Sequence, residues 1–487
     1  MKRLTISLIA AALAAGPAFA GAPLFTDITS KAGVGDAGNG KGVAFADIDN
    51  DGDWDLYVSN KGGANKLLRN DGKGVFTDIT AEAGEGVGDA GFVMGSVFFD
   101  FDNDGWTDLY LPKGGRYEIE ANRLLKNVGG TFVDVTDKAG VGSKEFTYAA
   151  ASADFDNDGF LDLYLANYGV GAKNILYRNN GDGTFTDVTD KAGVGDRSWS
   201  WMAVWADVNG DNKQDLYVVN GRYPAGEPNT LYINNGDGTF SDASRTSGIA
   251  DNGWGLGAAF ADTDKDGDLD LFISNYVGPN GYFINDGTGV FTPAGESAGL
   301  ADTGWGKGPT FGDFDNDGDL DLYEGDCKVA NQLYRNNGDG TYTDIAQDSP
   351  STRCAAVRTK GTAFVDIDGD GDLDLYAVNW AAENKLFLNS TNNGNWLKVR
   401  LTGTLSNAMG VGSRVWVRSG SKVEGVAEMA TSSGFCAQPP QELHFGVDAS
   451  KTYTVEVRFP SGQVKVIENV TPGQVLTVEE PGKVALR

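Results

Sequence analysis

Aspartates recur in short loops of this chain at a spacing that suits a hard metal ion. The pattern Asp-x-Asp-x-Asp-Gly-x-x-Asp-Leu, or a close variant, starts seven times, 51 to 55 residues apart, at Asp47, Asp100, Asp154, Asp207, Asp262, Asp313 and Asp366. Side chains at positions 1, 3, 5 and 9, with a backbone carbonyl at position 7, supply the oxygens that Ca²⁺ takes at about 2.3–2.6 Å. Glycine at position 6 lets the chain turn around the ion. The loops therefore predict up to seven structural calcium ions.

The predicted ligands occupy the same four positions in every repeat. Six repeats supply four aspartates each: Asp47, Asp49, Asp51 and Asp55; Asp100, Asp102, Asp104 and Asp108; Asp154, Asp156, Asp158 and Asp162; Asp262, Asp264, Asp266 and Asp270; Asp313, Asp315, Asp317 and Asp321; and Asp366, Asp368, Asp370 and Asp374. The fourth repeat supplies Asp207, Asn209, Asp211 and Asp215, with Asn212 at the glycine position. One charge fewer and a less permissive turn residue make this the weakest predicted site.

Two other interpretations of the acidic loops are less favoured. An EF-hand needs a glutamate at position 12 and flanking helices, but no glutamate recurs there and the flanks are typical of strands. Acidic hairpins without an ion would leave four carboxylates repelling one another. We expect calcium to stiffen the loops and raise stability rather than to take part in catalysis.

A repeat of about 50 residues carries these loops and predicts a β-propeller. In the first copy, residues 42–46, 55–58, 65–70 and 75–80 are short apolar or β-branched runs bounded by Gly, Asn and Asp. Each copy therefore predicts one antiparallel meander of four strands. The predicted fold class is all-β, a seven-bladed propeller over residues 21–390 followed by a small β-sandwich-like domain over residues 391–487.

The two ends of the repeat array complement each other. Residues 24–29 resemble a fourth strand without its first three, and the last copy stops after its third strand at residue 389. We expect residues 24–29 to complete the seventh blade and close the ring, which removes exposed sheet edges.

The first twenty residues are typical of an export leader. Lys2 and Arg3 precede an apolar run over residues 4–15, and Ala18-Phe-Ala20 forms a small-residue cleavage site. We expect a periplasmic or secreted protein without a membrane span. The net charge of −29 argues against nucleic acid as a partner. The sequence gives no oligomeric state.

Three cysteines are an odd number for an oxidising compartment. Cys327 follows the second strand of the sixth repeat, and Cys354 precedes the first strand of the seventh. An up-and-down meander places both on the face opposite the acidic loops, so a Cys327–Cys354 disulfide is the preferred pairing and Cys436 is left unpaired.

The repeats resemble the FG-GAP or VCBS repeats of the integrin α-subunit propeller and of many exported bacterial proteins, and the likeness covers residues 24–389. The segment over residues 393–481 looks like the ASPIC/UnbV domain that follows such repeats in the cartilage acidic protein family. Two departures are Phe459 before Pro-Ser-Gly, where Trp is usual, and Phe435-Cys-Ala-Gln in place of Tyr-Leu-Ser-Gln. The resemblance implies fold, calcium and export. It leaves activity open, because one propeller scaffold serves adhesion, glycan binding and, less often, catalysis.

A search for catalytic residues finds no established constellation. His444, the single histidine, lies in a predicted strand and is expected to be structural, and the motif His-Glu-x-x-His does not occur. Residues 35–42 imitate a phosphate loop but end in Gly and precede a strand. Paired carboxylates for glycoside hydrolysis stay open, although nearly all are assigned to calcium.

Aromatic residues gather on the predicted face opposite the acidic loops. Connections between blades carry Trp199, Trp201, Trp254 and Trp305, Trp380 follows a second strand, and Arg116 and Arg222 offer guanidinium groups. Aromatic rings suit sugar faces and protein hot spots, although these tryptophans could equally wedge the blades together.

The first hypothesis is therefore a non-enzymatic, exported, calcium-binding module for adhesion to a glycan or protein ligand. The alternatives are a carbohydrate-active lyase or dehydratase, using a propeller carboxylate or tyrosine with a divalent ion, and a scaffold of a periplasmic complex.

Overall fold

The computed structural model describes residues 24–115, 120–222, 226–249, 251, 253–349, 352–354 and 357–482. The predicted leader and Arg116 lie outside these residues. Among the helices of the described ranges, none is long and apolar enough to cross a membrane.

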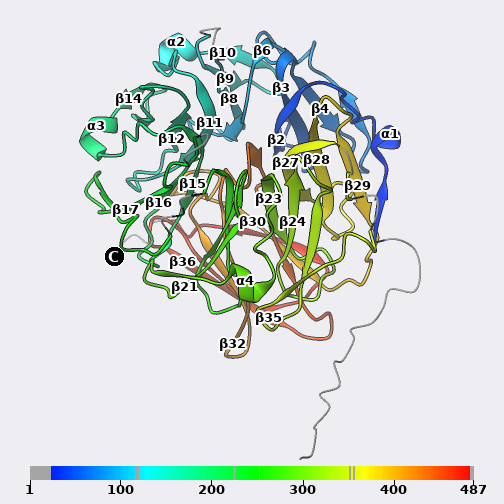
Figure 1. Cartoon of the computed structure of the whole chain (residues 1–487). Coiled ribbons are helices and arrows are strands. Elements are labelled where there is room, and N and C mark those ends of the chain that lie inside the picture. Colours follow the sequence, from blue (N-terminus) through cyan, green and yellow to red (C-terminus); the bar gives the residue numbers. More distant parts are fainter. Residues whose placement is uncertain are drawn as a thin grey trace, which may run out of the picture.

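The repeats fold into four-stranded antiparallel meanders that follow one another around a ring (Figure 1). The described residues form seven such sheets: β2 (Gly40–Ala46), β3 (Asp55–Ala64), β4 (Lys66–Asn70) and β5 (Phe76–Asp78); β7 (Val97–Phe99), β8 (Asp108–Leu111), β9 (Arg123–Asn127) and β10 (Phe132–Asp134); β11 (Thr147–Ala153), β12 (Asp162–Asn167), β13 (Ile175–Asn179) and β14 (Phe185–Asp187); β15 (Ser200–Ala206), β16 (Asp215–Asn220), β17 (Thr230–Asn234) and β18 (Phe240–Asp242); β19 (Gly255–Ala261), β20 (Asp270–Asn275), β21 (Gly281–Asn285) and β22 (Phe291–Pro293); β23 (Gly306–Gly312), β24 (Asp321–Asp326), β25 (Gln332–Asn336) and β26 (Tyr342–Asp344); and β27 (Arg358–Val365), β28 (Asp374–Trp380) and β29 (Lys385–Asn389) with β1 (Phe25–Asp27). The first of these sheets is extended by β6 (Ala90–Phe92), which pairs with β3. Short helices α1 (Thr29–Ala32), α2 (Thr136–Ala139), α3 (Thr189–Ala192) and α4 (Gly295–Ala298) follow four of the outermost strands. The predicted propeller is confirmed.

A recurrent asparagine at the end of each third strand ties every sheet to the sheet before it. Asn127 Nδ2 donates to the Ile48 carbonyl at 2.8 Å and Asn179 Nδ2 to the Phe101 carbonyl at 2.7 Å. The same bond closes the ring, because Asn70 Nδ2 donates to the Ile367 carbonyl at 2.9 Å. These bonds are buried, so each satisfies a carbonyl that water cannot reach.

The N-terminal strand completes the last sheet, as predicted. β1 pairs antiparallel with β29, with Phe25 opposite Asn389, and the Phe25 side chain is fully buried. The sheet edge that β29 would otherwise expose is therefore covered by a segment more than 350 residues distant in the sequence.

Phe25→Ala is expected to lower the free energy of unfolding by about 3–5 kcal/mol, the usual cost of emptying a buried phenylalanine site. Thr26→Ala, at an exposed position of the same strand, is the control. Urea unfolding monitored by tryptophan fluorescence measures both, and equal stabilities for the two variants would contradict closure by β1.

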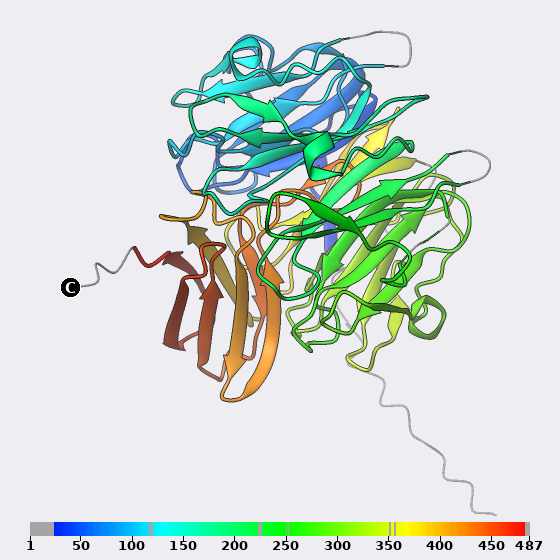
Figure 2. The same ribbon diagram turned by 90° about the vertical axis from the view of Figure 1, so that its left-hand side faces the viewer.

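The C-terminal strands form a separate β domain against the acidic-loop side of the ring (Figure 2). One sheet contains β34 (Leu443–Gly446), β30 (Trp396–Thr402) and β37 (Gln474–Glu479); the other contains β32 (Lys422–Glu428), β31 (Arg414–Ser419), β35 (Tyr453–Arg458) and β36 (Val464–Val470). Asn212 Nδ2 donates to the Pro460 carbonyl at 3.0 Å, and Arg414 bonds both Glu428 and the Asp207 carbonyl. The predicted C-terminal β domain is thus present, and it contacts the acidic loops directly.

One loop of this domain, residues 431–438, enters the central channel, and we call it the plug. Its strand β33 (Ala437–Gln438) pairs in parallel with β2. Thr431 Oγ1 donates to Ser152, Ser432 Oγ to Ala203, Gly434 N to Ala258 and Gln438 Nε2 to Phe98, in each case to the carbonyl, at 2.6–3.1 Å. The plug therefore bonds the innermost strands of five sheets.

Candidate functional site

The acidic loops bring carboxylates together at the spacing of metal ligands. In four loops one oxygen from each of positions 1, 3 and 9 lies within 4.8 Å of the others, and in the fifth loop positions 1, 3 and 5 do so: Asp47, Asp49 and Asp55; Asp100, Asp102 and Asp108; Asp154, Asp156 and Asp162; Asp313, Asp315 and Asp321; and Asp262, Asp264 and Asp266. These clusters have the donor set of a hard-cation site.

Backbone bonds shape each loop and leave particular oxygens unused. In the first loop the position 1 side chain, Asp47, accepts from Asp51 N at 3.1 Å and from Gly52 N at 3.0 Å. The position 9 side chain, Asp55, accepts from Ile48 N and Asn70 N. The position 5 side chain accepts from the amide two residues later in all seven loops: Asp51, Asp104, Asp158, Asp211, Asp266, Asp317 and Asp370.

The unused oxygens belong mainly to position 3. In five loops the buried Oδ1 atom at position 3 has no hydrogen-bond partner: Asp49, Asp102, Asp156, Asp315 and Asp368. At position 1 of the fifth loop, both oxygens of Asp262 also lack a partner. An unsatisfied buried carboxylate oxygen is costly, so its repetition fits a cation at that point. Burial also raises the pKa of Asp55 to about 7 and of Asp108 to about 9, the expected result for carboxylates held away from water beside other carboxylates.

The fourth loop, predicted to be the weakest site, has Asn209 in place of the position 3 aspartate. Asn209 Oδ1 is already used by Asp211 N at 3.0 Å. Lys213 Nζ lies 2.7 Å from Asp211 Oδ2, and Arg458 of the C-terminal domain lies 3.6 Å from Asp207 Oδ2. The protein's own cations therefore neutralise part of this loop, as Lys126, Arg178 and Lys398 also do in the second, third and seventh loops.

A second site lies at the opposite end of the innermost strands, where a pocket of about 860 Å³ opens over the channel. The residue six positions before the first aspartate of each repeat lines it in all seven copies: Lys41, Met94, Tyr148, Trp201, Leu256, Lys307 and Lys360. The pairing register shifts across this residue in six sheets. Such a bulge leaves one residue outside the ladder and redirects its side chain, here into the pocket.

Aromatic rings form a continuous wall along part of this pocket. Ring centroids are 4.6 Å apart for Tyr148 and Trp201, and 4.7 Å apart for Trp254 and Tyr276 and for Tyr276 and Trp305. The plug closes the bottom, where Phe435 and Cys436 pack with Met94, Tyr148 and Trp201. Stacked rings beside an open volume suit a flat or ring-shaped ligand.

The tryptophans expected to bind a ligand divide into two groups. Trp201, Trp254, Trp305 and Trp380 line the pocket. Trp199 instead packs on Tyr168 at 4.7 Å and borders a separate shallow hollow, with the Arg222 guanidinium 4.9 Å above its ring.

The sequence reasoning missed the basic residues of the pocket, Lys41, Lys61, Lys307, Arg358 and Lys360. Three of them could have been found by aligning the repeats on their first aspartates, because they occupy the same column as Tyr148 and Trp201.

The expected Cys327–Cys354 disulfide is not formed, because both cysteines are free thiols. Cys327 lines the pocket with its sulfur 2.9 Å from Lys360 Nζ. Cys354 packs against the cluster of Phe25 and Tyr323 between the last two sheets. The prediction placed both residues on one face but ignored their distance from the ring axis.

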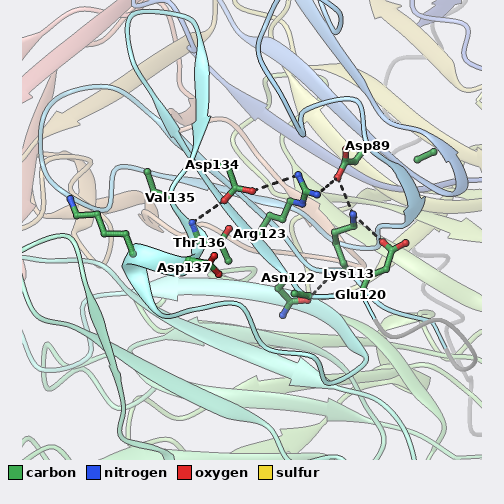
Figure 3. Close-up of a pocket in the computed structure, with 12 residues that line it drawn as sticks. Asp89, Lys113, Glu120, Asn122, Arg123, Asp134, Val135, Thr136 and Asp137 are labelled. Carbon is green, nitrogen blue, oxygen red and sulfur yellow. Dashed lines mark hydrogen bonds and ion pairs between the residues drawn. The ribbon is translucent and has the colours of Figure 1, made fainter.

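Two further features of the described residues have polar groups that are already used within the protein. The hollow of Figure 3 is lined by charges that already pair, with Lys113 Nζ 3.0 Å from both Asp89 and Glu120 and Arg123 within 3.6 Å of Asp89 and Asp134. His444 Nε2 contacts the Gly371 carbonyl at 3.1 Å, and burial lowers the pKa of His444 to about 4. Its place in β34 is that of a packed structural residue.

Together these features define a β-propeller of acidic-loop repeats whose channel is closed from one side by a C-terminal β domain. The FG-GAP-like repeat model matches residues 47–111, 154–218, 207–273, 262–324 and 325–377, and the ASPIC and UnbV model matches residues 403–485. The chain therefore belongs to the family of FG-GAP-like repeat proteins with an ASPIC and UnbV domain.

Curated relatives share this architecture at low identity. The chain is similar to cartilage acidic protein 1 of Homo sapiens, at 26% identity over 94% of this chain and 75% of that protein. It is 24% identical to cartilage acidic protein 1 of Xenopus tropicalis, over 90% of this chain and 72% of that protein. Among solved structures it is similar to BBS1N in complex with ARL6DN, with TM-score 0.46 and 8% identity over 76% of this chain and 97% of that chain.

Proposed function

We propose that this protein is an exported, calcium-binding propeller that holds a glycan or protein ligand in the channel pocket without changing it chemically. The observation that carries the proposal is the aromatic wall of Tyr148, Trp201, Trp254, Tyr276 and Trp305 around a pocket of about 860 Å³. A pocket of this size accommodates one or two sugar rings or a few side chains of a protein loop.

Calcium has a structural part in this proposal. The acidic loops lie one strand from the pocket, about 20 Å away for six residues at 3.3 Å each. An ion in a loop fixes the turn between the first two strands of its sheet, and so holds the first strand whose other end lines the pocket. The lyase or dehydratase alternative needs a divalent ion beside the ligand, and this distance disfavours it.

Binding to a glycan array, in calcium and in chelator, tests the proposal. Trp305→Ala is expected to weaken a hit at least tenfold, because it removes about 1.4 kcal/mol or more of ring contact. Trp416→Ala, which changes a half-buried tryptophan of the C-terminal domain, should bind like the unaltered protein. Binding that survives Trp305→Ala unchanged, or a folded and calcium-loaded protein without hits, would count against a glycan in this pocket.

A further inference from the structure

Three lysines enter the pocket from adjacent sheets. Lys307 on β23, Lys360 on β27 and Lys41 on β2 occupy the same repeat column, and β27 contacts both neighbouring strands. Their exposed fractions are 7%, 3% and 2%. A bulge at each position directs these side chains to the channel. The lysines therefore form a basic side of the pocket that adjoins the aromatic wall, because Lys307 Nζ lies 5.1 Å from the Tyr276 ring centroid and 5.7 Å from that of Trp201.

None of these three lysines forms an ion pair with a described carboxylate, although the chain carries 68 acidic residues. The other titratable groups that line the pocket are Lys61, Arg358, the Cys327 thiol and the phenols of Tyr148, Tyr168 and Tyr276, with the Cys436 thiol of the plug below them. No acidic side chain is among the described lining residues.

Buried cations elsewhere in the same protein are paired, which makes the pocket an exception. Lys398 Nζ lies 2.5 Å from Asp366 and 3.3 Å from Glu442, and Arg414 lies 2.9 Å from Glu428. Buried charges are normally compensated in this way. In the pocket the compensation is limited to rings and thiols: Lys41 Nζ is 3.6 Å from the Trp380 centroid, and Lys307 Nζ is 5.0 Å from that of Phe435.

We propose that the pocket binds an acidic saccharide, with the carboxylate of a uronic acid held by Lys41, Lys307 and Lys360 and its ring stacked on the aromatic wall. This inference rests on the proposed binding function and specifies its ligand class. The basic side supplies charge-assisted hydrogen bonds to the carboxylate, and the adjoining aromatic wall supplies flat apolar surface for the sugar ring.

Protonation of the lysines gives binding a pH dependence. Burial, and repulsion from Lys360, lower the pKa of Lys307 to about 7, and the pKa of Lys41 is lowered well below its usual value mainly by burial. A bound carboxylate favours the ammonium forms and raises these pKa values. Binding therefore takes up protons above about pH 7, and affinity falls as the pH rises further.

Calorimetric titration of the intact protein in calcium tests the inference with three matched probes: a disaccharide ending in glucuronic acid, its methyl ester, and the corresponding neutral glucose disaccharide. The acid is expected to bind at least tenfold more tightly than the ester and the neutral sugar, and less tightly at pH 8.5 than at pH 6.5. Lys307→Met with Lys360→Met should abolish the preference for the acid, whereas Lys31→Met, an exposed lysine in α1, should leave it.

The outcomes separate this inference from the proposed function. Equal binding of acid and ester, lost in Trp305→Ala, would overturn the acidic ligand while keeping the binding pocket. If none of the three probes binds in a way that depends on Trp305, the acidic saccharide is overturned, and the proposed pocket is left with a protein ligand alone. The lysine variants provide a second readout, because replacing unpaired buried cations should raise the Tm in the absence of ligand. If the double variant Lys307→Met with Lys360→Met has a lower Tm, the two lysines stabilise the fold instead of binding the ligand.

Discussion

Chelating calcium is expected to lower the stability of this protein more than any single substitution away from the loops. An ion present at about 100 times its Kd stabilises the folded state by about 2.7 kcal/mol per site, and five loops have a buried position 3 oxygen with no partner. Several occupied sites would together contribute about 10 kcal/mol or more. Scanning calorimetry in 1 mM calcium and in EGTA measures the change, and magnesium, which prefers a smaller octahedral shell, should restore it poorly.

Asp49→Ala isolates one site in this experiment. Asp49 Oδ1 is buried without a partner, so removing it should reduce the bound calcium, measured by elemental analysis, by one ion per chain. Asp137→Ala, at an exposed position in α2, should leave the stoichiometry unchanged. If the protein unfolds at the same temperature with and without EGTA, calcium does not stabilise the fold and the prediction is contradicted.

Much of the fold could be predicted because the same strand and turn pattern recurs in every repeat. A single loop such as residues 47–55 is ambiguous, but copies in phase fix the strand order, and the incomplete ends at residues 24–29 and 384–389 predict the closure that β1 and β29 make. The acidic clusters follow for the same reason, since ligands within one short loop depend on local geometry and on little else.

The pocket could be predicted only in part, because it depends on contacts that local sequence does not contain. Trp305 was found through its residue type, whereas Lys41 was considered only within a false phosphate loop. Lys41 lies in the pocket because a bulge in β2 redirects its side chain, and it faces the lysines of β23 and β27 there. Neither feature can be seen in the sequence around Lys41. The predicted Cys327–Cys354 disulfide was wrong for the same reason. The order of the strands predicts on which face of the propeller a residue lies, but not how far it lies from the propeller axis.

The plug was likewise invisible in the sequence, where Phe435-Cys-Ala-Gln appeared only as a departure from a familiar motif. Two glycines that lie against the plug, Gly42 and Gly95, show how closely its backbone approaches the propeller. A Cβ at Gly42 would lie 2.6 Å from the Cys436 carbonyl oxygen, and a Cβ at Gly95 would lie 2.9 Å from the Cys436 Cα atom. Neither position has a positive φ, so glycine is needed there for close approach of the plug backbone rather than for its conformation.

Replacing residues 432–437 with a Gly-Ser linker of equal length is expected to lower the free energy of unfolding by about 5–10 kcal/mol. Loss of the fully buried Phe435 side chain accounts for about 3–5 kcal/mol. The amides of Val43 and Ala258 now donate to the main-chain carbonyls of Cys436 and Gly434. A flexible linker without the Phe435 anchor would not hold these carbonyls in place, which costs about 1–3 kcal/mol for each amide left without a partner. The same change removes the bottom of the pocket, so ligand binding should fall at least tenfold even in molecules that remain folded.

Two smaller changes keep this prediction testable if the linker variant fails to fold. Gly95→Ala should push the plug away and lower both Tm and ligand affinity, because its new methyl group would lie 2.9–3.2 Å from the Cα, Cβ and Sγ atoms of Cys436, a buried residue with little room to move. Gly63→Ala, where the nearest atom outside the adjoining residues is 3.8 Å from the added carbon, should change neither. If Gly95→Ala binds ligand and unfolds like Gly63→Ala, the C-terminal domain does not build the pocket, and its contacts with the acidic loops would have to explain why it is joined to the propeller.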